Sequence, residues 1–223
     1  MTKHPATYND KFISIFAHYL NLYKCKNVLD PFAGVGKLAM VKEYGFNGEV
    51  YCNEIEQEWT LANIYPVDHW FVGDAEFMDF ASNGFFDAII TSPTYGNRMA
   101  DHHEAKDKSK RITYRHYLGH ELNNDNTGRM QWGDSYREKH ILVYHRCRSL
   151  LKAGGLFILN VSDHIRKGQV INVSEWHLNT LVDLGFILKE DIVVETPRMR
   201  YGKNSSLRVN HEHIYIMEKA NVY

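Results

Sequence analysis

The chain alternates between short apolar runs and longer amphipathic segments. Apolar residues recur at helical spacing in five segments, which we expect to be helices: 12–22, 37–45, 57–65, 136–152 and 174–186. Seven further runs are rich in β-branched and aromatic residues and predict strands: NVLD, GEVYCNEI, HWFVG, FFDAIITS, LFILNVSDH, ILKEDIVVE and HEHIYIME. This alternation predicts an α/β fold with a doubly wound, mostly parallel seven-stranded sheet and helices on both faces.

Candidate chemistry follows the first four predicted strands. Parallel α/β sheets bind ligands beyond the carboxyl ends of their strands. The residues at these ends are 30–34, Glu54, Asp74 and 92–95, all of them polar, glycine or part of a turn. We therefore expect the functional site to gather from these four strand ends.

Residues 97–135 break the alternation of strands and helices. They are polar and rich in turn formers, and they hold seven lysines and arginines against six acids. A loop of this length is usually functional or disordered. We expect one domain over residues 1–223, with 97–135 inserted as a lid or target-contact segment. A plain solvated loop is the alternative.

Composition narrows the class of protein. Hydrophobic residues make up 44% and charged residues 24%, the balance of an ordinary globular chain. No run approaches the ~20 apolar residues of a membrane span, and residues 1–12 lack the apolar core of a signal peptide. Three scattered cysteines indicate reduced thiols and a cytoplasmic protein. With a net charge of −1, any nucleic-acid contact must come from local basic patches.

The run GVGK after the first strand is not a phosphate-binding loop. That motif needs glycine where this chain has Pro31, and serine or threonine where it has Leu38. The dinucleotide pattern GxGxxG also fails in part, because its last position is Ala39. Neither nucleotide-binding motif accounts for the glycine turn.

Two motifs together resemble the S-adenosylmethionine-dependent amino-methyltransferases of DNA. The family's first motif, D-P-F-x-G-x-G, is similar to residues 30–36, and its catalytic motif, [D/N/S]-P-P-[Y/F/W], is similar to 92–95. Residues 4–12 resemble the family segment that covers the cofactor. The resemblance implies a class I methyltransferase fold with S-adenosylmethionine as the cofactor. It implies cofactor-binding roles for Thr7, Asp30, Pro31, Phe32, Ala33, Gly34, Gly36, Glu54 and Asp74.

Physical chemistry agrees with parts of this assignment. Glycines at 34 and 36 allow a close backbone approach to a ligand. Glu54 ends the second strand, where an acid accepts hydrogen bonds from ribose hydroxyls. Asp74 is placed to accept from an adenine amino group, or to cap a short helix.

The catalytic motif predicts methylation of an exocyclic amino group. Such a nitrogen is conjugated to its ring and is a poor nucleophile. The Ser92 hydroxyl and the Pro93 carbonyl can accept hydrogen bonds from it, while Tyr95 stacks on the extruded base. In the family, serine at the first position is associated with cytosine N4 and aspartate mostly with adenine N6. Thr94 departs from the motif, because the family has a second proline there.

Local basic patches could hold a nucleic-acid target. The candidates are in the insert and in the acid-free stretch near the C-terminus: Arg98, Arg115, Trp132, Arg198, Arg200, Lys203 and Arg208. A solvated hairpin tip is the alternative for the second patch. His211-Glu212-His213 lacks the spacing H-E-x-x-H, so we expect no metal, although His211 and His213 share one strand face.

These observations favour S-adenosylmethionine-dependent methylation of an amino group in DNA, most consistently cytosine N4. Three alternatives remain open: an adenine-N6 DNA enzyme, an RNA base amino-methyltransferase and a catalytically inactive nucleic-acid-binding relative. We expect no membrane partner and no structural metal.

Overall fold

A seven-stranded sheet forms the centre of the protein. The computed structural model describes residues 7–96, 114–196, 207 and 209–221. The strand order is β3-β2-β1-β4-β5-β9-β8, and β9 runs in the direction opposite to the other six strands. This confirms the predicted mostly parallel sheet. The strands are β1 (Asn27–Asp30), β2 (Glu49–Glu54), β3 (His69–Val72), β4 (Phe86–Thr91), β5 (Leu151–Val161), β8 (Phe186–Glu195) and β9 (His211–Lys219).

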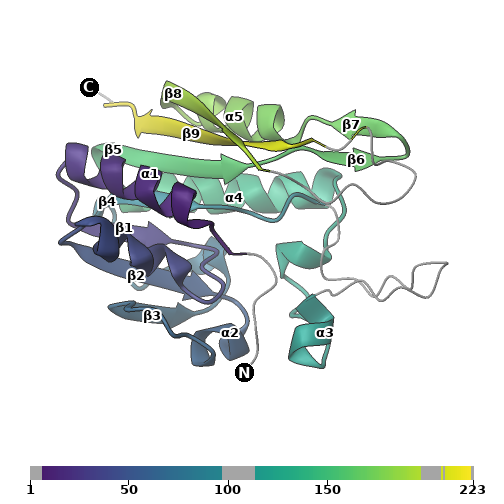
Figure 1. Ribbon diagram of the computed structural model, residues 1–223, viewed down its shortest axis with the longest axis horizontal. Helices are drawn as coiled ribbons and strands as arrows, with labels where there is room; N and C mark the ends of the chain where they lie inside the picture. The colour runs from purple at the N-terminus through teal and green to yellow at the C-terminus, as the bar shows by residue number, and fades with distance from the viewer. Residues whose placement is uncertain (1–6, 97–113, 197–206, 208, 222–223) are drawn as a thin grey trace.

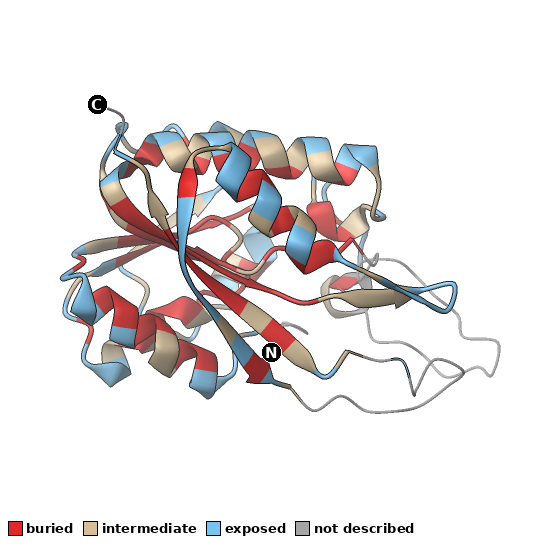
Figure 2. Ribbon diagram, turned by 90° about the horizontal axis from the view of Figure 1, so that it is seen from above, coloured by how far each residue is buried: buried red, intermediate tan, exposed pale blue. Residues whose placement is uncertain are grey.

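The central strands are mostly apolar because both faces of the sheet are buried. In β1, Val28 packs into one core cluster and Leu29 into the other. In β4, Ile90 packs into the same cluster as Val28, and Ile89 packs into the same cluster as Leu29. Successive strand residues point to opposite faces, so an uninterrupted apolar run supplies two cores at once. Figure 2 shows the resulting band of buried residues through the middle of the molecule.

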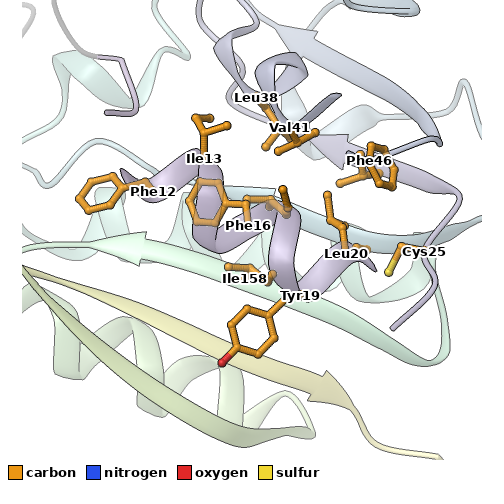
Figure 3. Packing of buried hydrophobic residues seen from close by; sticks show 14 of the residues in the cluster. Phe12, Ile13, Phe16, Tyr19, Leu20, Cys25, Leu38, Val41, Phe46 and Ile158 are labelled. Atoms are coloured by element: carbon orange, nitrogen blue, oxygen red, sulfur yellow. The ribbon is translucent and has the colours of Figure 1, made fainter. Parts of the chain in front are cut away.

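Helices cover both faces, as predicted. Helix α1 (Asp10–Leu22) and the 3-10 helix η1 (Lys37–Tyr44) pack on one face, while α4 (Asp134–Leu150) and α5 (Val173–Asp183) pack on the other (Figure 1). Asn9 caps the N-terminus of helix α1, because its side chain accepts the Phe12 N–H. Its apolar stripe lies against the sheet and η1, with Phe16 fully buried (Figure 3).

Three local features differ from the sequence-based predictions. Residues 37–44 form a 3-10 helix between two left-handed glycines rather than an α-helix. Helix α2 (Gln57–Leu61) ends before the predicted boundary at 65, because the Asn63 side chain accepts the Tyr65 N–H in a turn. The hairpin of β6 (His164–Arg166) and β7 (Gln169–Ile171) was not predicted. It turns at Lys167 and Gly168, both with positive φ.

Short elements gather at the carboxyl edge of the parallel strands. Helix α2, helix α3 (Tyr114–Leu118) and the β6–β7 hairpin lie at this edge in Figure 1. The 3-10 helices η2 (Ala75–Phe77) and η3 (Thr127–Arg129) come from the loops that follow β3 and β4. The described part of the insert thus returns to the edge where the sequence predicts the site.

Candidate active site

One cavity of about 500 Å³ joins both sequence motifs at the carboxyl edge of the sheet. Its size suits a cofactor or substrate. The predicted site residues that line it are Thr7, Pro31, Phe32, Ala33, Gly34, Glu54, Asp74, Ser92, Pro93 and Tyr95. The glycine turn and the catalytic motif are therefore two walls of one chamber.

The two glycines of the turn have different roles. Gly34 lines the cavity with a φ of 55°, and its N–H donates to Glu54 Oε2 over 2.7 Å. Gly36 is not among the lining residues. Its φ is 77°, and a Cβ there would lie 2.6 Å from the ring of Trp70. Packing and turn geometry thus require glycine at position 36, and the cofactor contact expected there stays a prediction.

Glu54 is a nearly buried acid at the end of β2, with 8% of its surface exposed. One carboxylate oxygen accepts the Gly34 N–H, and the other accepts the Glu56 N–H over 3.1 Å. Burial raises the pKa of Glu54 to about 7, although these backbone hydrogen bonds oppose the shift. The carboxylate both orders the glycine turn and faces the cavity.

Asp30 lies beneath the cavity rather than among its lining residues. Its carboxylate accepts from Tyr8 Oη at 3.1 Å, Thr91 Oγ1 at 2.9 Å and the Phe32 N–H at 3.1 Å. Burial raises its pKa to about 7, against the effect of these donors. Among the described residues no cation pairs with Asp30. It stabilises the loop, and a cationic ligand group would relieve its desolvation.

Asp74 has both of its carboxylate oxygens engaged. Oδ1 accepts the Glu76 N–H at 3.0 Å, which is the helix-cap role considered as an alternative. Oδ2 pairs with Lys139 from α4, which also contacts Glu76 over 2.8 Å. Asp74 still lines the cavity. Its side chain therefore joins η2 to α4 at the cavity wall.

The catalytic loop is held by hydrogen bonds on several sides. Ser92 Oγ lies 3.3 Å from Tyr95 Oη. Thr94 Oγ1 donates to Thr127 Oγ1 at 3.1 Å, and its carbonyl accepts from Tyr136 Oη. These contacts restrain the loop at the position where the family motif has its second proline.

The described end of the insert, residues 114–135, closes one side of the cavity. Glu56 Oε1 accepts from the Asn123 N–H and from Asn126 Nδ2, both at 2.8 Å. Tyr114, Asn126 and Thr127 line the cavity beside Trp59. This part of the insert is therefore a wall of the site.

The predicted nucleic-acid contacts are placed only in part. Arg98, Arg198, Arg200, Lys203 and Arg208 lie outside the described residues, and Arg115 lies in α3 with its side chain outside the description. The Trp132 ring packs edge-on against Trp176, with the Arg137 guanidinium 4.8 Å from its centre. The backbone N–H of Trp132 donates to the Gly96 carbonyl. Its role in the described structure is packing beneath the catalytic loop.

Several lining residues were missed from the sequence: Tyr8, Trp59, Lys139, Asn160 and Glu212. One signal was available for Asn160, which interrupts the apolar run of β5. Tyr8 lies in the segment 4–12 that resembles the family's cofactor-covering segment, and Glu212 lies in the triplet considered as a metal candidate. No motif marks Trp59 or Lys139, and only the fold brings them to the cavity.

Comparisons with known proteins agree with this geometry. A sequence profile of N6/N4 methyltransferases, described as DNA methylase, matches residues 86–223, more than half of the chain. A comparison with the sequences of curated proteins gave no match. The profile match begins at β4, so it includes the catalytic motif and leaves out the glycine turn.

Several of the solved structures that are similar to this chain are methyltransferases. A candidate RNA methyltransferase from Pyrococcus horikoshii is 15% identical, with a TM-score of 0.56 over 95% of this chain and 84% of that one. A SAM-dependent methyltransferase from Methanosarcina mazei is 12% identical, with a TM-score of 0.56 over 99% of each chain. TrmN from Thermus thermophilus is 18% identical, with a TM-score of 0.49 over 92% of this chain, which spans 48% of TrmN.

The sheet and the neighbours show the fold of S-adenosylmethionine-dependent methyltransferases, and the profile match over residues 86–223 makes the chain a member of that class. More narrowly, the chain belongs to the DNA methylase family of N6 and N4 amino-methyltransferases. Within the described residues, no helix combines the length and apolar character needed to cross a membrane.

Proposed function

We propose that this enzyme methylates the exocyclic N4 of cytosine in DNA. The observation that carries the proposal is the shared cavity, in which Ser92 and Tyr95 face the same space as Gly34 and Glu54. A target amino group between the loop and the glycine turn would meet hydrogen-bond acceptors on one side and the cofactor on the other. Family membership supports amino-methylation, and Ser92 in place of aspartate favours cytosine.

The cavity walls suit S-adenosylmethionine. When bound, the cofactor supplies a methyl group on a positively charged sulfur. Glu54 would accept hydrogen bonds from the ribose hydroxyls, and Gly34 leaves room because it has no side chain. Asp74 would accept from the adenine amino group, with Phe32 at the wall. The Asp30 carboxylate lacks a cationic partner among the described residues, and the positive charge of the ligand complements it from above.

The chain's own residues would activate the target nitrogen. Ser92 Oγ and the Pro93 carbonyl accept the two amino hydrogens, which draws the nitrogen lone pair out of conjugation with the ring. Tyr95 stacks on the base and holds it in place. These hydrogen bonds strengthen as positive charge develops on the nitrogen, so they act mainly on rate.

The remaining assignments concern the target. We expect residues 97–135 to act as a lid within one domain over 1–223, with Arg98, Arg115 and Trp132 near the target. The basic residues Arg198, Arg200, Lys203 and Arg208 would contact phosphates. A DNA target and three buried free cysteines are consistent with a cytoplasmic enzyme.

Nucleoside mass spectrometry tests the proposal. DNA and RNA from cells that express the enzyme are compared with those from cells that express Ser92→Ala. We expect N4-methylcytosine in DNA from the wild type only. N6-methyladenine in its place would overturn the choice of base, and a mark confined to RNA would overturn the choice of substrate.

A further inference from the structure

Strand β9 brings a buried acid to the catalytic loop. It runs antiparallel beside β5, so its first residues lie where β4 and β5 end. Within His211-Glu212-His213 the middle residue is buried, with 8% exposed, and it lines the cavity. His213 instead pairs with Asp191 on β8 at 2.9 Å. The sequence singled out this triplet only as a metal candidate.

Hydrogen bonds through Tyr95 connect Glu212 to Ser92. Tyr95 Oη donates to Glu212 Oε2 over 3.3 Å, and Ser92 Oγ lies 3.3 Å from Tyr95 Oη. Asn160 Nδ2 donates to the same Glu212 oxygen over 3.0 Å. Three neighbouring strands thus contribute to one network: β4 through its loop, β5 through Asn160 and β9 through Glu212.

The acid determines the direction of these hydrogen bonds. A carboxylate has no hydrogen to donate, so the Tyr95 hydroxyl must give its hydrogen to Glu212. The Tyr95 oxygen is then an acceptor toward Ser92, and the single Ser92 hydrogen points to Tyr95. The remaining lone pairs of Ser92 Oγ are left for the cavity. If Tyr95 instead donated to Ser92, the Ser92 hydrogen would point at the target amino group. That amino group has to donate to Ser92, so the two hydrogens would oppose each other.

We infer that Glu212 is a positioning residue, which acts through Tyr95 to hold Ser92 Oγ as a hydrogen-bond acceptor for the target amino group. Asn160 anchors the acid, since its Nδ2 also approaches the His213 carbonyl at 3.4 Å. The inference deepens the proposed function and rests on it. It assigns Glu212 no contact with the reacting atoms.

Two substitutions at position 212 separate the roles of the acid. Glu212→Gln keeps a carbonyl oxygen that can accept from Tyr95 and Asn160, whereas Glu212→Met keeps the bulk and removes the acceptor. Single-turnover methyl transfer to DNA should fall roughly 10-fold in Glu212→Met and stay within about 3-fold in Glu212→Gln. Cofactor affinity, measured by calorimetry, should change in neither. His211→Ala, next to Glu212 on the same strand, is the matched control and should keep the wild-type rate.

A double-mutant cycle tests whether Glu212 acts through Tyr95. Tyr95→Phe keeps the stacking ring and should lose roughly the same 10-fold as Glu212→Met. Adding Glu212→Met to Tyr95→Phe should cost less than about 2-fold more. The inference is overturned if the rate losses of the two single variants multiply in the double variant, or if Glu212→Gln is as impaired as Glu212→Met. A fully active Tyr95→Phe would also overturn it, and that result does not depend on whether the Met variant folds.

The proposed function fails by a different result. It fails if the wild-type product is not N4-methylcytosine, which mass spectrometry of the same reactions reports. The cycle compares rates of methyl transfer whichever amino group accepts the methyl. If the methylated base is not cytosine, the test of Glu212 still holds. If the losses at Glu212 and Tyr95 are independent, the assignment of the base still holds.

Discussion

The two halves of the active site are built in different ways. In the cofactor half, each acid at a strand end accepts a backbone N–H: Asp30 that of Phe32, Glu54 that of Gly34 and Asp74 that of Glu76. Asp30 and Asp74 also contact side chains of distant elements, Thr91 and Lys139. In the target half, side chains bind side chains from distant parts of the chain. Tyr95 and Glu212 are 117 positions apart, and Asn160 and Glu212 are 52 apart.

This difference explains why one half is visible as a motif. The turn at residues 30–36 needs fixed residues at fixed spacing, because Asp30 accepts the Phe32 N–H and Gly34 and Gly36 have positive φ. A network across β4, β5 and β9 needs only that the strands lie side by side. The two halves therefore predict different responses to substitution: the cofactor half should change affinity and stability, and the target half should change rate.

The largest expected effect is at Ser92. Ser92→Ala removes the acceptor for the target amino group and should lower single-turnover methyl transfer by roughly 100-fold or more. Cofactor affinity should stay unchanged, because the hydrogen bond acts on the transition state. Rapid-quench kinetics and calorimetry measure the two quantities. An equal loss of rate and of cofactor affinity would contradict the distinction between the cofactor half and the target half.

Asp30→Asn should stabilise the cofactor-free protein at alkaline pH. Burial raises the Asp30 pKa to about 7, so between about pH 4 and 7 the folded protein binds more protons than the unfolded chain. Its free energy of unfolding therefore falls as the pH rises through this window. Asparagine removes that penalty, and we expect a gain of about 4 kcal/mol at pH 8 that falls to about 1 kcal/mol at pH 4.5. Urea denaturation checks this, with the exposed Asp183→Asn as control. A gain of equal size at both values would contradict it.

Glu54→Ala should weaken cofactor binding roughly 10- to 100-fold, because a charged acceptor for the ribose hydroxyls is lost. Calorimetry with S-adenosylmethionine and with a 2′,3′-dideoxyribose analogue sharpens the test. The analogue should bind the variant and the wild type with similar affinity, since it lacks the hydroxyls. A full loss for both ligands would assign Glu54 to the order of the glycine turn alone.

The smallest expected effect is at Thr94. Thr94→Val removes the hydrogen bond to Thr127 and should lower the free energy of unfolding by about 1 kcal/mol. Methyl transfer should fall only a few-fold, because Tyr136 still holds the Thr94 carbonyl. Thr127→Val should have the same effect on stability, and the double variant should add little. Additive losses would show that the two hydroxyls stabilise the loop separately.

The fold was largely predictable because its signals are local. Apolar runs mark strands buried on both faces, and Gly45 and Gly185 end helical segments. The β6–β7 hairpin was missed because its strands are three residues each, too short for a period. Helix α2 was predicted too long because the Asn63 turn competes with the helix.

The sequence by itself determined the α/β alternation, the glycine turn and the catalytic loop, because each depends on residues close together in the chain. Only the tertiary structure decided that Gly36 serves packing against Trp70, that Lys139 pairs with Asp74, and that Glu212 reaches Tyr95. These contacts join elements far apart in the chain. The strand order and the packing of helices on the sheet bring them together, and no local spacing encodes that order.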